Sequence, residues 1–231
     1  MKKDITYREI ECIRENIDDF INNLYKNFQS EIDITKADES FYRRIAKYII
    51  FCKMLKSSFD FKEIHIFLDN VISDSYYMIL SIIKREKRYM YVNLRSIIEN
   101  NIRMITHVTW ESTHVTKDVF EKIKNEKYNL SREGYDLLRS EYREACAFIH
   151  GGKLLSPNLS YVLADCLEKD EMVPKERNKL YKRVERILKL FNSMLITEYT
   201  RIVNNVFYRR KSVLKYLIGS EMLELLFKHL K

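Results

Sequence analysis

Glycine and proline are scarce in this chain, whose 231 residues include 4 Gly and 2 Pro, against roughly 7% and 5% in average proteins. A β-sandwich or barrel needs turn residues every ten or so positions, and a doubly wound α/β fold needs glycine at its tight loops. The chain has too few glycine and proline residues for either fold, so we expect an all-α chain. Because 46% of the residues are apolar, the chain can bury a sizeable core and fold as a globular protein.

Apolar residues recur at steps of three and four along most of the chain, which is the period of an amphipathic helix. We expect a single domain, 1–231, of long up-and-down helices. The first predicted helix covers about 6–29, and Thr35 or Asp38 caps a second helix that ends near Ser57. The remaining predicted helices cover 64–83, 90–109, 117–128, 131–150, a short segment at 159–168, 174–211 and the C-terminal MLELLFKHL. The helices at 64–83 and 90–109 could be one bent helix, since no proline separates them.

The sequence lacks the motifs of several common classes of protein. There is no GxxxxGK[ST], GxGxxG, HExxH or GxSxG motif, so no cofactor is expected. Cys12, Cys52, Cys146 and Cys166 form no CxxC pair, which indicates reduced thiols rather than a zinc site. The N-terminus is charged and no run of 18 apolar residues occurs, so we expect a soluble, cytoplasmic protein with no membrane partner.

Two histidines lie close together in the sequence, His107 and His114. They could form a metal pair across a loop, although a surface or core histidine is the more common outcome. We therefore predict no metal site. Four tyrosines, Tyr76, Tyr77, Tyr89 and Tyr91, could stack on nucleic-acid bases, but aromatic residues at helical spacing are more often part of the core.

The basic excess is confined to the last quarter of the chain. Residues 174–231 hold 14 Lys and Arg against 5 Asp and Glu, whereas residues 1–173 hold 27 against 28. One face of the helix at 174–211 carries Lys175, Lys179, Lys182, Arg183, Arg186 and Lys189. Such a stripe could follow an RNA backbone, with Lys153, Lys179, Lys182, Arg186 and Lys189 as the contacts. The alternative is an ordinary solvated helix face.

The segment LRSEYREACAFIHGGK, residues 138–153, could carry chemistry. Arg143 and His150 are seven positions apart, which places them on one helix face about two turns from each other. Arg139 falls on that face as well, at the edge of an apolar stripe formed by Leu138, Tyr142, Ala145 and Ile149. His150 would end its helix before two glycines, where the helix dipole favours an imidazolium.

An arginine beside a histidine can act on a phosphodiester. Attack by a neighbouring 2′-hydroxyl needs a proton acceptor that titrates near neutrality and a cation for the charge that develops on the phosphate. The alternative is a structural role, in which Arg143 pairs with Glu99, Glu141 or Asp136 and His150 caps the last carbonyls of its helix. Arg95 and Glu99, four positions apart, are expected to form an ion pair.

The stretch YREACAFIHGG resembles the R-x(4-6)-H motif of HEPN (higher eukaryotes and prokaryotes nucleotide-binding) domains, and YVNLRSIIENNIRMITHV resembles the Leu-Arg…Glu helix that precedes that motif in several HEPN-like proteins. The resemblance covers about residues 90–152 and the long helix that follows, which gives a HEPN-like core at 90–211. Residues 1–60 lie outside it. The position after the arginine is often Asn, Asp or His in active members, and here it is Glu144.

The resemblance implies a helical toxin or phage-defence effector that cleaves RNA without a metal, as a homodimer whose motif helices pair. It implies that Arg143 holds the scissile phosphate and that His150 is the general base or acid, with Arg139, Arg95 and Glu99 as possible support. RNA, a second copy, and an antitoxin or other defence-system protein are the implied partners. A non-catalytic helical module that binds RNA or a partner protein remains the alternative function.

Overall fold

The computed structural model describes residues 5–28, 33–109, 117–149, 160 and 172–230, and no β-strand occurs among them. The prediction of an all-α fold with long up-and-down helices is therefore confirmed. The helices are α1 (Ile5–Phe28), α2 (Lys36–Lys56), α3 (Lys62–Ile83), α4 (Lys87–Thr106), α5 (Lys117–Lys122), α6 (Arg132–Ile149), α8 (Pro174–Glu198), α9 (Thr200–Val206), α10 (Lys211–Ile218) and α11 (Ser220–His229), with a 3-10 turn at Glu126–Tyr128.

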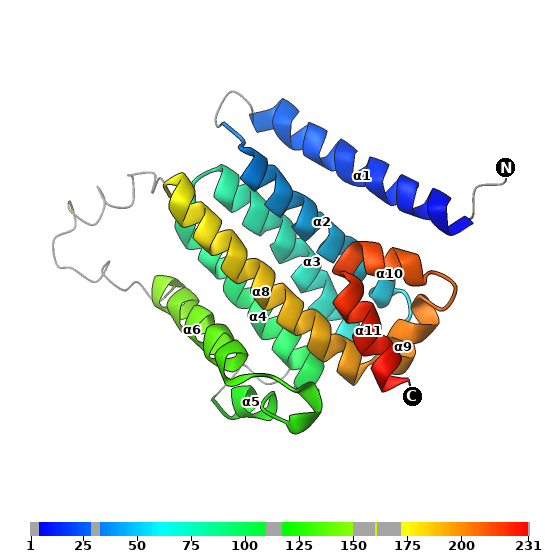
Figure 1. Ribbon diagram of the computed structural model, residues 1–231. Helices are drawn as coiled ribbons and strands as arrows, with labels where there is room; N and C mark the ends of the chain where they lie inside the picture. Colours follow the sequence, from blue (N-terminus) through cyan, green and yellow to red (C-terminus); the bar gives the residue numbers. More distant parts are fainter. Residues whose placement is uncertain (1–4, 29–32, 110–116, 150–159, 161–171, 231) are drawn as a thin grey trace.

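Four helices, α2, α3, α4 and α8, form the centre of the molecule, because α2 packs on α3, α3 on α4, and α8 on both α2 and α4 (Figure 1). Short loops make α2, α3 and α4 antiparallel neighbours. Their facing stripes are closed to solvent, as shown by Ile45, Phe51, Leu94, Ile98 and Phe191, each 0% exposed. Burial of these stripes supplies the main driving force for folding.

The remaining helices cover this bundle from three sides. Helix α1 lies along α2 and contacts α10, helix α6 packs on α4 and α8, and the short helices α9, α10 and α11 gather at one end (Figure 1). Helices α1 and α6 lie on opposite sides of the bundle. The motif helix is thus an outer layer rather than a core helix.

The predicted start of α2 is confirmed, with Thr35 as its N-cap. The Thr35 hydroxyl accepts a hydrogen bond from the Asp38 backbone N–H at 3.2 Å, and the Asp38 carboxylate accepts one from the Thr35 backbone N–H at 2.9 Å. This reciprocal pair is a capping box and satisfies backbone donors that the first turn leaves open.

The prediction of one helix over 174–211 was wrong, because the chain breaks at Tyr199 between α8 and α9. The Thr197 hydroxyl donates to the Ser193 carbonyl at 3.0 Å, and that of Thr200 donates to the Ile196 carbonyl at 2.8 Å. Threonine bonds of this kind bend helices. The buried Tyr199 hydroxyl donates to the Met104 carbonyl at 2.6 Å, which ties the break to the end of α4.

The predicted helices at 64–83 and 90–109 are separate, as α3 and α4, because Arg85 adopts a positive φ of 60° and turns the chain, so the alternative of one bent helix is excluded. Two further boundaries differ from the sequence-based expectation. The predicted helix at 117–128 is split into α5 and the 3-10 turn. Helix α10 was not predicted, and Gly219, with φ 96°, separates it from α11. Of the predicted helix at 159–168, only Ser160 is among the described residues, and it is helical.

Helix α3 is, within the described part of the chain, the one helix long and apolar enough by length and composition to cross a membrane, and half of its most apolar window is buried inside the molecule. Buried core helices of soluble proteins pass the same test. Phe67, Leu68 and Val71, which lie within the helix, belong to the core.

Candidate functional site

Helix α6 runs antiparallel to both of its neighbours. Near its start Glu133 pairs with Arg186 at 3.3 Å, further along Glu141 pairs with Arg183 at 2.8 Å, and at its end the Ile149 carbonyl accepts a hydrogen bond from Arg88 at 3.3 Å. The C-terminal half of α6 therefore lies beside the N-terminal turns of both α4 and α8. Those turns carry basic side chains such as Arg88 and Lys179.

The inner face of α6 is packed as the apolar stripe predicted. Leu138 and Ala145 are both 0% exposed. Gly134 permits the close approach to α8, since a Cβ there would lie 3.2 Å from Leu190 Cδ2 and 3.0 Å from Leu130 Cδ1. Glu141 is also buried on this face, and burial raises the pKa of its carboxyl, an effect that the positive charge of Arg183 only partly offsets.

Arg143 lies on the outer, exposed face of α6, rather than in a seam with another helix of the same chain. The three carboxylates proposed as structural partners of Arg143 pair with other arginines. Glu99 pairs with Arg95 and Arg103, Glu141 pairs with Arg183, and Asp136 pairs with Arg132. Arg143 has no ion pair among the residues that the structure describes. Its guanidinium therefore presents its donors to solvent.

The other residues of the predicted site are only partly placed. Arg139 is half-buried one turn before Arg143, and the described residues offer it no ion pair. His150 and Lys153 lie outside the described residues. His150 directly follows Ile149, so the contact between Arg88 and the Ile149 carbonyl places a cation at the end of the helix that leads to the histidine.

A set of contacts that the sequence did not predict holds the end of α6 against α4. Tyr91 stacks on Phe148 with ring centroids 4.1 Å apart and donates a hydrogen bond to Glu144 at 2.8 Å. Lys87 lies 5.6 Å above the Phe148 ring. The charge run at 84–88 was a signal for these cations, but only the antiparallel packing of α4 and α6 brings Lys87 and Arg88 to the motif.

Arg95 and Glu99 form the predicted ion pair, at 3.6 Å. Glu99 also accepts a hydrogen bond from Arg103 at 3.0 Å, and Arg103 is 5% exposed. The Arg95 guanidinium lies 5.7 Å from the ring centre of Tyr142 on α6. Burial raises the pKa of Tyr142, and the Arg95 charge opposes that effect. The contact between Arg95 and Tyr142 therefore joins α4 to α6.

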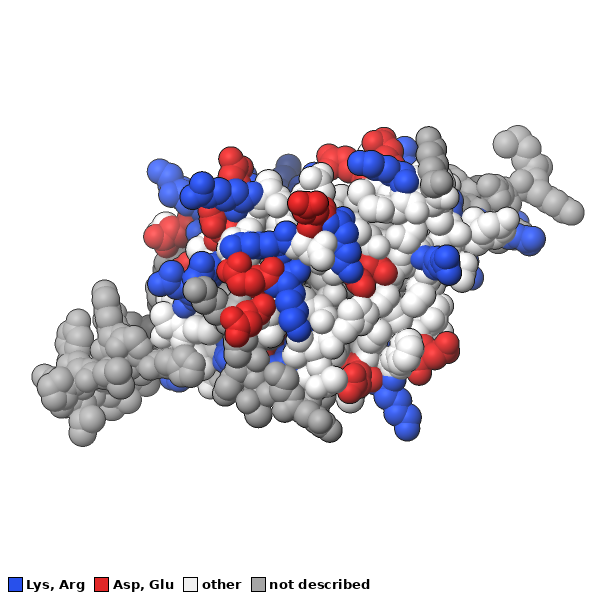
Figure 2. Space-filling model, turned by 90° about the horizontal axis from the view of Figure 1, so that it is seen from below, with Lys and Arg blue, Asp and Glu red and all other residues white. Residues whose placement is uncertain are grey.

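The basic stripe on α8 is neutralised along part of its length. Arg183 pairs with Glu141, Arg186 with Glu133, and Lys189 with Glu221. Lys175, Lys179 and Lys182 are exposed and have no ion pair within the described ranges. On the face shown in Figure 2, basic and acidic side chains lie among one another over part of the surface, and much of the remaining described surface is uncharged. The unpaired part of the stripe is thus its N-terminal end, beside the second half of α6.

A cluster around Glu198 includes one of the two histidines considered for a metal. The Glu198 carboxylate accepts hydrogen bonds from Tyr128 at 2.6 Å and Lys127 at 2.5 Å, and lies 2.8 Å from His107 Nε2. Burial raises the pKa of Glu198, but these three partners outweigh burial and hold the pKa below its usual range. His114 lies outside the described residues, within which no group of three or more His, Cys, Asp or Glu side chains could hold a metal ion.

The four tyrosines considered for base stacking divide into two pairs. Tyr91 is buried, and Tyr76 is half-buried with its ring centre 6.0 Å from that of Phe20. Tyr77 and Tyr89 are 58% and 60% exposed. The core interpretation holds for the first pair, whereas the second pair is available to a partner.

No protein-family model, no curated protein and no solved structure matches this chain.

Proposed function

We propose that this protein is a cytoplasmic, metal-independent endoribonuclease of HEPN type that acts as a toxin or phage-defence effector. Arg143 would bind the scissile phosphate, and His150 would take the proton of the attacking 2′-hydroxyl or return a proton to the leaving oxygen. One observation carries the proposal: the Arg143 guanidinium is exposed and has no ion pair within the described part of the chain, while Glu99, Glu141 and Asp136 pair with other arginines.

The charges around the end of α6 support this chemistry. Arg88 reaches the Ile149 carbonyl, and the exposed Lys179 and Lys182 belong to the end of α8 that flanks the same half of α6. These cations would attract RNA to this end of α6 and would contribute positive charge near a phosphodiester bound at Arg143. Glu144 is held by Tyr91 at 2.8 Å, so it is engaged in the packing of the helix.

The experiment that tests the activity is incubation of the purified full chain with total RNA or tRNA in excess EDTA. Cleavage with 2′,3′-cyclic phosphate ends is the expected result, because the 2′-hydroxyl is the proposed nucleophile. Products with 3′-hydroxyl ends would contradict the mechanism. Cleavage that stops in EDTA would replace it with metal chemistry, with the Glu198 cluster as the first region to mutate.

We predict that the protein is a homodimer whose contact includes the outer face of α6. A two-fold axis would double a sparse pair of catalytic groups, and Ala147 is exposed on that face. Light scattering should give the mass of two chains, and Ala147→Glu should reduce it to one chain. Ser212→Glu, at an exposed position on α10, is the control. A monomeric wild type at tens of micromolar would exclude a composite site.

We also predict that RNA affinity depends on the unpaired end of the basic stripe. Lys179→Gln with Lys182→Gln should weaken RNA binding for every sequence and reduce the slope of log affinity against log salt by about 1.4, since each phosphate contact to single-stranded RNA contributes about 0.7. Arg186→Gln with Lys189→Gln removes the same charge where carboxylates already neutralise it, so the slope should change less. Equal effects of the two double variants would indicate only a general charge effect.

The alternative function is a non-catalytic module that binds RNA or a partner protein. The exposed rings of Tyr77 and Tyr89 on α3 and α4 favour a protein partner, because aromatic side chains are enriched in protein interfaces. A wild type that binds RNA or a partner but cuts no RNA would establish this function in place of the ribonuclease.

A further inference from the structure

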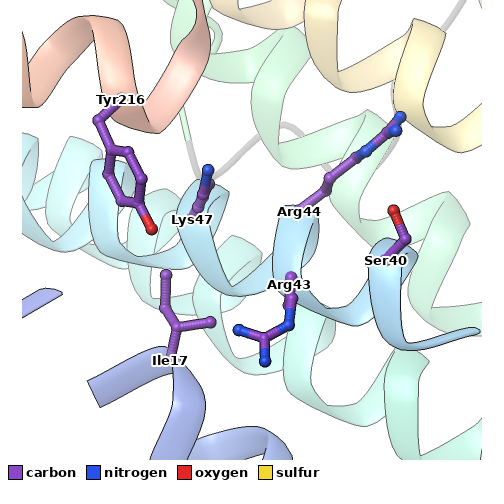
Figure 3. Close-up of a pocket in the computed structure, with 6 residues that line it drawn as sticks. All are labelled: Ile17, Ser40, Arg43, Arg44, Lys47 and Tyr216. Atoms are coloured by element: carbon purple, nitrogen blue, oxygen red, sulfur yellow. The ribbon is translucent and has the colours of Figure 1, made fainter. Parts of the chain in front are cut away.

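A second basic site lies away from the motif helix, on the outer side of α2 where α1 and α10 approach it. It is a pocket of about 230 Å³. Its lining residues are Ile17 of α1, Ser40, Arg43, Arg44 and Lys47 of α2, and Tyr216 of α10 (Figure 3). Tyr216 and Lys47 lie at one end, Ser40 lies at the other, and the two arginines point to either side of α2.

The sequence of α2 makes this pocket basic. Ser40, Arg43, Arg44 and Lys47 are spaced by three, one and three positions, so they share one face of the helix. Residues 40–56 contain five basic and no acidic side chains. The residues of α2 that line the pocket therefore present hydrogen-bond donors and one hydroxyl group, with the Glu39 carboxylate one turn before Arg43 at the edge of this face.

The two arginines are held in place by carboxylates from their surroundings. Arg43 pairs with Asp18 and with Glu39, and Arg44 pairs with Glu185. Arg43 uses Nε and Nη1 in these contacts, and Arg44 uses Nη1. Among the described residues, Arg43 Nη2 and the Nε and Nη2 of Arg44 have no partner. Each guanidinium is thus preorganised and still has donors for a ligand.

Lys47 is the cation without a carboxylate. Its ammonium lies 3.9 Å from the ring centre of Tyr216, and within the described part of the chain it has no ion pair. Arg14 approaches the same ring, at 5.9 Å. Burial lowers the pKa of Lys47, and the positive charges of Arg14, Arg44 and Arg43 lower it further. A half-buried lysine surrounded by arginines gains most from an anion that can contact several of them.

We propose that this pocket is an oxyanion site that binds a phosphate or diphosphate group through Arg43, Arg44 and Lys47. A multiply charged anion with several acceptor oxygens matches two guanidinium groups and an ammonium better than a single carboxylate does. The pocket, of about 230 Å³, is large enough to hold a phosphate or a diphosphate group. The bound group is either free inorganic phosphate or diphosphate, or the terminal phosphates of a nucleotide.

Isothermal titration calorimetry on the full chain, at low ionic strength, tests the site with inorganic phosphate, pyrophosphate, ADP and adenosine as probes. We expect pyrophosphate and ADP to bind, pyrophosphate to bind more tightly than phosphate, and adenosine not to bind. ADP and pyrophosphate of equal affinity would assign recognition to the phosphates alone, and much tighter ADP would identify a nucleotide as the source. Absence of binding by all three phosphate probes at millimolar concentration would overturn the proposal.

Lys47→Met should weaken pyrophosphate binding about tenfold or more, the loss expected for a charge-assisted contact. Lys53→Met is the matched control, because Lys53 lies on the same helix, also packs on a tyrosine ring, that of Tyr76 at 5.3 Å, and does not line the pocket. Arg44→Gln, which changes an exposed side chain, provides a second variant if Lys47→Met unfolds, as judged by thermal melting. Equal losses for Lys53→Met and Lys47→Met would show general attraction to a basic protein and overturn the site.

Discussion

Arg143→Ala should lower the rate of RNA cleavage by about a hundredfold to ten-thousandfold, the usual contribution of a positioned acid, base or charge at the reacting group. The same loss is expected for His150→Ala. Arg143 is exposed and makes no ion pair within the described ranges, so its removal should leave the melting temperature unchanged. The rate is measured with tRNA in EDTA, with single-turnover kinetics to separate binding from chemistry.

Arg132→Ala is the matched control for the arginine on the same helix. Arg132 lies in the first turn of α6, is 95% exposed and has only a long contact of 3.8 Å with Asp136, so its removal should leave the cleavage rate within twofold of wild type, as expected for a solvated pair. Arg143→Lys keeps the charge but not the planar fork that grips a phosphate with two donors, and an intermediate rate is expected. Wild-type rates in both Arg143→Ala and His150→Ala would exclude the proposed ribonuclease site.

Asp38→Ala should destabilise the protein by about 3–5 kcal/mol, the range for breaking a buried ionic network from one side. Asp38 is 3% exposed and accepts hydrogen bonds from Tyr181 at 2.6 Å, Arg177 at 3.3 Å and the Thr35 backbone N–H at 2.9 Å. The variant would leave the Arg177 charge and the Tyr181 hydroxyl without this acceptor and would remove half of the capping box of α2. Urea denaturation measures the free energy of unfolding.

Two variants distinguish the effect of breaking the buried Asp38 network from the effect of losing a carboxylate in general. Asp38→Asn keeps one acceptor oxygen for Tyr181 and should cost less than Asp38→Ala. Asp136→Ala removes a carboxylate that is 63% exposed, and its effect should stay within about 0.5 kcal/mol. If Asp38→Ala costs less than about 1 kcal/mol, the contact between α2 and α8 at this position contributes little to the fold.

Local signals account for how well the individual helices were predicted. The period of apolar residues defines α1, α2, α3, α4 and α6 to within a few residues, because a helix with one buried stripe requires that period. The capping box at Thr35 and Asp38 is also local, since its two residues are three positions apart. The break at Tyr199 could not be read in the same way, because the apolar stripe continues through it and its hydroxyl bonds the distant Met104.

The candidate site shows the same division. The sequence places Arg143 on a helix that ends near His150, and it identifies Arg95 and Glu99 as a pair, because all of these relations are spacings along one helix. The sequence does not show which of the charged side chains are neutralised by ion pairs. Arg186 and Lys189 looked equivalent to Lys179 and Lys182, and only the approach of Glu133 and Glu221 distinguishes them.

The sequence by itself determined an all-helical fold, the periods and ends of most helices, and the residues on each helix face, because helix geometry depends on neighbours within a few positions. The tertiary structure alone decided that α6 lies outside the bundle, that Arg88 of α4 reaches the carbonyl of Ile149, and that α1 and α10 close a basic pocket over α2. Contacts between distant segments depend on which helix faces meet, and many pairings of faces bury similar apolar area. Charge pairing and the shape of a pocket are therefore properties of the packed molecule.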